Sequence, residues 1–72
     1  MAHHPFKIRR LYVGAKLRDV AEIVKVPVVR IHRWETNKTR PDKVQLSIWE
    51  AALRRLEAVA RQKMMEAKEW AK

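Results

Sequence analysis

Residues 17–37 read LRDVAEIVKVPVVRIHRWETN, and this stretch predicts two short helices with a tight connection between them. The apolar side chains of its first half recur at helical spacing, namely Val20, Ala21 and Val24. They predict a helix over residues 17–24. Pro27 sets the backbone angle for the first turn of a second helix, predicted over residues 27–35 or 27–36. Two short helices joined by three or four residues have the spacing of a helix-turn-helix.

The second helix is predicted to have one inward and one outward face. Ile31 and Trp34 share a face that lies over Val26, so these side chains are expected in the core. The side chains left to project outward are Val28, Val29, Arg30, His32 and Arg33. The outward face is therefore basic and available to a binding partner.

The flanking segments predict two further helices. Pro5 is suited to the first turn of one helix, and Gly14 is well placed to end it. Asn37 can accept the left-handed conformation that follows a helix end. Thr39 and Asp42 resemble a capping box, with Pro41 in the first turn, so a fourth helix is expected to begin near Arg40. It is expected to run almost to the C-terminus, because good helix formers dominate residues 42–72 and no Gly or Pro interrupts them.

Charge is the main functional signal in the composition. The 72 residues carry 17 Lys and Arg against 8 Asp and Glu, a formal net charge of +9. Residues 1–41 hold ten basic and three acidic side chains, whereas residues 42–72 hold seven and five. A basic first half favours a polyanionic partner such as nucleic acid, with solubility as the alternative explanation. The absence of Cys excludes disulfides and Cys-based zinc sites, so side-chain packing must hold the fold.

The helical pattern resembles the phage repressor and Cro (XRE-like) helix-turn-helix family. The resemblance covers about residues 6–53 and rests on the joint spacing of several positions rather than on any one of them. The matching residues are Arg10, Gly14, Ala21, Ile31, Trp34, Glu35, Lys38 and Pro41. It implies an all-α, four-helix repressor-like domain with an extended C-terminal helix. It also implies a regulator, most simply a repressor, that binds double-stranded DNA.

Carried over to this chain, the resemblance implies that the helix over residues 27–35 lies in the major groove. Val28, Val29 and Arg33 would face base edges, with Arg30 and His32 beside them. A guanidinium such as that of Arg33 can contact guanine with two hydrogen bonds, whereas a valine can contact only apolar groups such as the thymine methyl. For Val28 and Val29, packing or contact with a partner protein is the alternative interpretation.

Two other groups of residues acquire roles from the resemblance. Phosphate contacts are implied for the basic residues near the edges of the helix-turn-helix, which are Lys16, Lys38, Arg40 and Lys43. These contacts would position the protein without specifying sequence, and a merely solvated charge cluster is the alternative. Arg10 and Glu35 match an ion pair that ties the first helix to the end of the third, so we assign them a structural role.

Three positions depart from the family pattern. Pro27 replaces a small polar helix cap, Lys25 replaces a glycine in the turn, and Leu17 replaces a polar residue at the start of the second helix. The first two changes affect the expected geometry of the turn. Leu17 would lie exposed near the phosphates, where it adds nothing to DNA affinity.

The C-terminal helix carries a seven-residue seam. Apolar or small positions recur at alternating spacings of four and three, at Trp49, Leu53, Leu56, Ala60, Lys63, Ala67 and Trp70. Residues 44–56 are expected to close the core, which gives a DNA-binding domain over residues 5–56 and a helical extension over residues 57–72. We expect a homodimer through Leu56, Ala60, Lys63, Ala67 and Trp70. The alternative is an extension folded back on its own domain.

A second function class remains open, in which the chain is a protein-interaction module, antitoxin-like or adaptor, that acts through this C-terminal helix. An enzyme is not expected, because no Ser, Cys or carboxylate pair has catalytic spacing to a His. We also expect no cofactor, and no metal at His3 and His4. With no membrane span and no signal-peptide core over residues 1–6, the chain is expected to be soluble and cytoplasmic.

Overall fold

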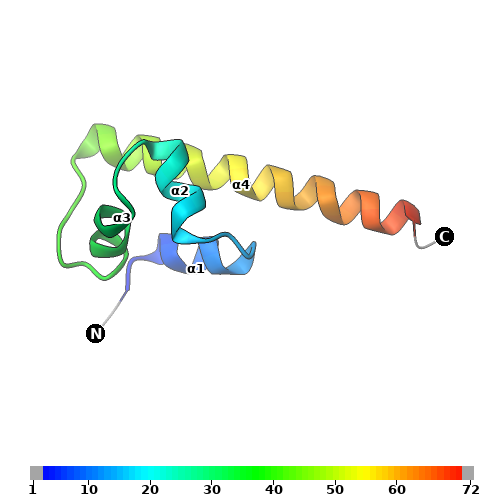
Figure 1. The fold of residues 1–72 in the computed structure, drawn as a ribbon, viewed down its shortest axis with the longest axis horizontal. Helices are drawn as coiled ribbons and strands as arrows, with labels where there is room; N and C mark the ends of the chain where they lie inside the picture. The colour runs from blue at the N-terminus through cyan, green and yellow to red at the C-terminus, as the bar shows by residue number, and fades with distance from the viewer. Residues whose placement is uncertain (1–2, 71–72) are drawn as a thin grey trace.

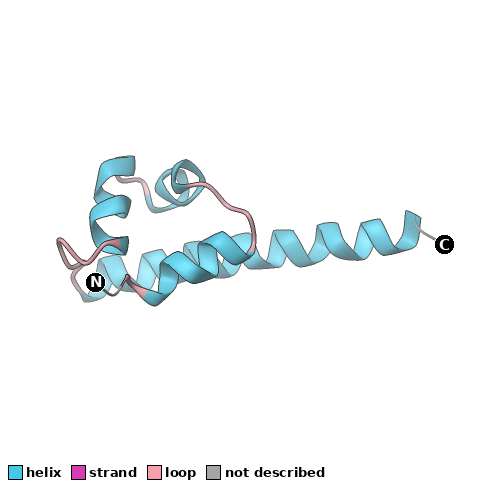
Figure 2. Ribbon diagram, turned by 90° about the horizontal axis from the view of Figure 1, so that it is seen from below, coloured by secondary structure: helices cyan, strands magenta, loops and turns pink. Residues whose placement is uncertain are grey.

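The computed structural model describes residues 3–70, with side chains to Ala67. Within that range the chain forms four α-helices and no strand, which confirms the all-α prediction. The helices are α1 (Pro5–Tyr12), α2 (Leu17–Val24), α3 (Val28–Glu35) and α4 (Lys43–Trp70). Helices α1, α2 and α3 gather around the first half of α4, and the second half of α4 projects beyond them as a continuous rod (Figures 1 and 2).

The core lies where three short helices meet the first half of α4. Its buried apolar residues are Val20, Ala21, Val24, Ile31, Trp34, Trp49, Ala52 and Leu53. The Trp49 ring is central, with its centroid 4.8 Å from that of Phe6 and 5.4 Å from that of Trp34. Aromatic rings at these separations attract each other beyond the area they bury. The predicted inward positions Ile31 and Trp34 are thus confirmed, with Val26 partly buried against them.

Leu17 does not behave as the sequence suggested. Instead of lying exposed, it is partly buried and packs against the core. It is the first residue of α2, and its side chain lies on the same face as Val20, Ala21 and Val24. Its hydrophobicity therefore has a structural explanation.

The first helix begins and ends as its sequence predicts. Pro5 is its first residue, and the backbone N–H of Phe6 donates a hydrogen bond of 3.1 Å to His4 Nδ1. Partial burial lowers the pKa of His4, an effect that the nearby Glu35 carboxylate opposes. Gly14 has a φ of +72°, the left-handed conformation in which glycine is least strained. The helix consequently ends at Tyr12 and the chain turns into α2.

The turn before α3 contains a strained lysine. Lys25 has φ 64° and ψ 46°, so it adopts the left-handed conformation that glycine adopts with least strain. Its backbone N–H donates to the carbonyl of Ala21 at 2.8 Å, which ends α2. Pro27, predicted in the first helical turn, is extended with ψ 146° and caps the helix, which begins one residue later at Val28. The turn between α2 and α3 is thus formed with a left-handed Lys25 and an extended Pro27.

Replacing Lys25 by glycine is expected to raise the free energy of unfolding by about 0.5–1 kcal/mol. A left-handed conformation costs a residue with a Cβ roughly 1–2 kcal/mol, and the greater freedom of glycine in the unfolded chain offsets about half of that gain. Urea unfolding followed by circular dichroism measures the change. The control is Glu22→Gly in the middle of α2, which should destabilise by about 1 kcal/mol. A loss of stability in Lys25→Gly would contradict the account of this turn.

The start of α4 corrects one prediction. The helix begins at Lys43 rather than near Arg40, and the capping residues are Asp42 and Gln45 instead of Thr39 and Asp42. Gln45 N–H donates to Asp42 Oδ1 at 2.7 Å, and Asp42 N–H donates to Gln45 Oε1 at 3.1 Å. Pro41 explains the shift, because a proline disfavours helical angles in the residue before it. Asn37, with φ 59°, has the predicted left-handed conformation after α3.

The contribution of α4 to the core also begins later than expected. Val44, Leu46 and Ile48 are exposed, and the first fully buried residue of α4 is Trp49. The opening turns of α4 thus contribute little to core burial. Only residues 49–56 therefore close the core.

Candidate nucleic-acid interface

The outer face of α3 is presented to solvent by a well-anchored helix. Ile31 and Trp34 hold it from beneath, with 0% and 2% of their surfaces exposed. The five side chains predicted to read bases are all exposed, namely Val28, Val29, Arg30, His32 and Arg33. Two adjacent valines at 43% and 54% exposure form an apolar spot among these basic residues. Such a surface can combine apolar contact with hydrogen bonds from cations.

The predicted contact between Arg10 and Glu35 is present and buried. Arg10 Nε donates to Glu35 Oε2 at 2.7 Å, and a terminal guanidinium nitrogen donates to Oε1 at 3.0 Å. The other terminal nitrogen donates to the carbonyl of Ala15 at 2.9 Å. Arg10 is 7% exposed and Glu35 only 2%. One guanidinium thus joins α1, the α1–α2 turn and the last residue of α3.

The end of α3 is held by the N-terminal segment as well. The backbone N–H of His4 donates to the backbone carbonyl of Glu35 at 2.8 Å. The His4 ring centroid lies 4.6 Å from that of Trp49. Sequence reasoning did not identify this role of His4, because the contact joins distant parts of the chain. Together with the buried ion pair, it fixes the C-terminal end of α3.

A second ion pair between distant parts of the chain was not predicted. Arg9 contacts Glu57 through two hydrogen bonds, of 3.1 and 2.7 Å, and the side chains are 31% and 30% exposed. The hydrogen bonds from Arg9 lower the pKa of Glu57. No local spacing could reveal a pair separated by 48 positions. Glu57 therefore contacts the helical globule, one residue beyond the boundary expected at position 56.

The residues predicted to contact phosphate lie in three different segments of the chain. Lys16 precedes α2, Lys38 and Arg40 lie in the loop after α3, and Lys43 opens α4. All four are exposed, and none forms an ion pair with another side chain described in residues 3–67. Other cations are neutralised within the molecule, as by the Arg54–Glu50 contact of 2.7 Å. These four cations thus lack an ion-pair partner among the described side chains.

Three arginines share one depression in this surface, which we call the arginine hollow. It has a volume of about 380 Å³ and is lined by Pro27, Val29, Arg30, Arg33, Trp34, Thr39, Arg40 and Gln45. The hollow lies where α3, the following loop and the start of α4 meet. No acidic side chain is among its lining residues. Arg30 is thereby placed beside Arg40, although the sequence separated them into base and phosphate contacts.

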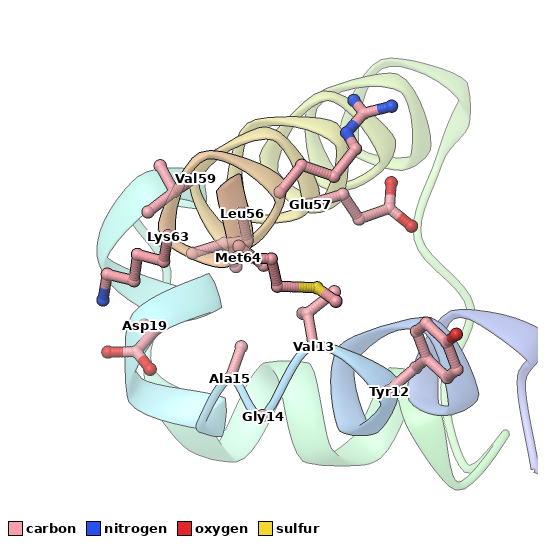
Figure 3. A pocket seen from close by; sticks show the side chains of 12 residues that line it. Tyr12, Val13, Gly14, Ala15, Asp19, Leu56, Glu57, Val59, Lys63 and Met64 are labelled. Atoms are coloured by element: carbon pink, nitrogen blue, oxygen red, sulfur yellow. The ribbon is translucent and has the colours of Figure 1, made fainter. Parts of the chain in front are cut away.

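A larger depression, the α4 groove, lies at the other end of the globule (Figure 3). The second half of α4 faces the α1–α2 turn across about 680 Å³. The residues around it include Tyr12, Val13, Gly14, Ala15, Asp19, Leu56, Val59, Ala60, Lys63 and Met64. Leu56 and Ala60 of the predicted seam are half-buried, while Lys63 and Ala67 are exposed. The side chain of Trp70 lies outside the described residues.

Among side chains described in residues 3–67, no group of three or more His, Asp or Glu could hold a metal ion. The described helices include none that is long and apolar enough to cross a membrane. No family model, curated protein or solved structure matches the chain.

Proposed function

We propose that this chain binds double-stranded DNA in a sequence-specific manner and regulates transcription, most simply as a repressor. The observation that carries the proposal is the outer face of α3, an exposed basic and apolar surface on a helix fixed from beneath and at its end. A helix presented in this way fits the dimensions of the major groove. The exposed cations without ion-pair partners supply the attraction to phosphates.

Base discrimination would come from few side chains. Arg33 is the residue best suited to a bidentate contact with guanine, and Val28 and Val29 suit thymine methyl groups. His32 can add a hydrogen bond. We therefore propose a guanine flanked by thymines as the preferred half-site. Because valines offer no hydrogen bonds, discrimination per half-site would be modest.

A titration of duplex DNA at several salt concentrations tests the proposal. Contacts from Lys16, Lys38, Arg40 and Lys43 predict that log K falls with log salt at a slope of roughly −3 to −4 per protomer. Fluorescence anisotropy with labelled duplex, single-stranded DNA and hairpin RNA measures the preference. Tighter binding to the duplex supports the proposal. Equal binding to all three nucleic acids would contradict it and would show only a general attraction to polyanions.

We further propose that two copies of the chain associate through the α4 groove. Val59 and Met64 are exposed in an isolated copy even though both line the groove. The apolar face of α4 that seals the core continues past the globule, and a second copy would cover it. A two-fold dimer would also place two α3 helices on successive turns of one duplex face, so a palindromic operator is expected.

Met64→Lys is expected to weaken this dimer about tenfold or more, because burial of a Met side chain contributes roughly 1.5–3 kcal/mol. Met65→Lys is the matched control, since Met65 is 68% exposed against 65% for Met64 but does not line the groove. Analytical ultracentrifugation measures both dissociation constants. If Met65→Lys has the larger effect, or if the native chain is monomeric, the proposed interface is wrong.

The alternative function, an interaction module for another protein, rests on the same groove. It would apply if the groove binds a different chain and α3 has no nucleic-acid ligand. The two substitutions in α4 also separate these functions. Under the proposed function, Met64→Lys weakens dimer assembly on an operator but leaves binding of one protomer to one half-site intact.

A further inference from the structure

The arginine hollow brings together three cations from two different segments. Arg30 and Arg33 belong to α3, and Arg40 belongs to the loop that precedes α4. Three guanidinium groups around one depression repel each other. Elsewhere in the molecule Arg9, Arg10 and Arg54 each have a carboxylate partner. Among the side chains described in residues 3–67, the three arginines of the hollow form no ion pair. An anion from outside can therefore bind them without displacing an internal partner.

Two residues that line the hollow are held in place by contacts within the protein. Trp34 is 2% exposed, and its indole is held in the core. Gln45 uses its side-chain oxygen to accept the N–H of Asp42, so the remaining hydrogen-bonding group of its amide is a donor. The Asp42 carboxylate accepts the backbone N–H of Gln45 and is not among the lining residues. The hollow consequently presents polar donors around a rigid apolar base.

Helical geometry separates the roles of the two arginines in α3. Arg30 lies three residues after Pro27 and four before Trp34, so it shares the helix face that forms the base of the hollow. Arg33 lies four residues after Val29 and shares the face of that exposed valine. Arg30 and Arg40 thus line the same hollow, one from α3 and the other from the following loop, while Arg33 lies on the face proposed to read bases.

We infer that the arginine hollow binds a single phosphate group, with Arg30 and Arg40 as its principal ligands. The planar guanidinium forms paired hydrogen bonds to phosphate oxygens, which suits two arginines that line one depression. When the phosphate belongs to a duplex backbone, the inference rests on the proposed function. Arg30 then positions α3 on the DNA and does not read a base, which changes the role that the sequence suggested for it.

The first experiment uses inorganic phosphate and the full chain. Titration followed by NMR of the arginine Nε–H groups is expected to show saturable shifts at Arg30 and Arg40. Arg30→Gln and Arg40→Gln should each weaken phosphate binding about tenfold or more. Arg55→Gln is the control, because Arg55 is exposed on α4 and does not line the hollow. Equal shifts at all exposed arginines, or no saturation, would overturn the site.

The second experiment uses duplex DNA and separates this inference from the proposed function. Arg30→Gln should weaken all duplex sequences alike and reduce the salt slope by about one, with base preference unchanged. A changed base preference, or an unchanged affinity, would overturn the inference while DNA binding stands. Saturable phosphate binding by a chain that binds no duplex would support the hollow as a site for free phosphate and overturn the proposed function. Thermal unfolding of each variant verifies that the exposed substitutions leave the fold intact.

Discussion

Replacing Glu35 by alanine is expected to lower the free energy of unfolding by about 3–5 kcal/mol, because it leaves the buried Arg10 guanidinium without its counter-ion. Arg10 would keep only its hydrogen bond to the carbonyl of Ala15. The total free energy of unfolding of a small domain is about 5–15 kcal/mol. We therefore expect the variant to lose a large fraction of its stability and to unfold at a markedly lower temperature than the native chain. Urea unfolding at neutral pH, followed by circular dichroism, measures the loss.

Two comparisons isolate the buried charge as the cause. Glu57→Ala removes the partner of Arg9 in a half-exposed pair and is expected to cost about 1 kcal/mol or less. The double variant Arg10→Met/Glu35→Leu removes both buried charges and should recover much of the stability lost in Glu35→Ala. Equal losses for Glu35→Ala and Glu57→Ala would show that burial of the Arg10–Glu35 pair has no special role.

The second large effect is expected at Arg33. Arg33→Ala should reduce discrimination between guanine and other bases at one half-site position by about 1–3 kcal/mol. Lys38→Ala should weaken binding to all duplex sequences alike and reduce the salt slope by about one, because a phosphate contact carries no sequence information. Competition titrations with single-base variants of a selected site, at two salt concentrations, measure both quantities. If the two variants behave alike, Arg33 has been assigned the wrong role.

Local patterns in the sequence predicted the parts of the fold that depend on helical spacing and chain reversal. Ile31 and Trp34 share a face three residues apart, and their burial follows from that spacing. Gly14 and Asn37 both adopt the left-handed conformation, which glycine and asparagine accept more readily than other residues. The Arg10–Glu35 contact was predicted only through the resemblance, because no physical rule connects positions 25 residues apart.

The errors arose where two local signals competed or where a contact joined distant residues. Thr39 and Pro41 suggested an early start for α4, but Asp42 and Gln45 form the capping box. Pro41 disfavours helical angles at Arg40, so the helix begins later. Leu17 was judged by its expected distance from phosphates rather than by its position on the apolar face of α2. The arginine hollow could not be predicted, because it depends on the path of the loop from α3 to α4.

Selection of bound duplexes from a random pool by the full chain tests the central claim, that the outer face of α3 reads DNA. Sequencing of the bound fraction at moderate salt is expected to yield a motif with guanine flanked by thymines. Paired half-sites should lie about 34–36 Å apart, or one helical turn. The same selection with Arg33→Ala should lose the preference for guanine. A pool without any enriched motif, or an Arg33→Ala variant that enriches the same motif as the native chain, would contradict the account.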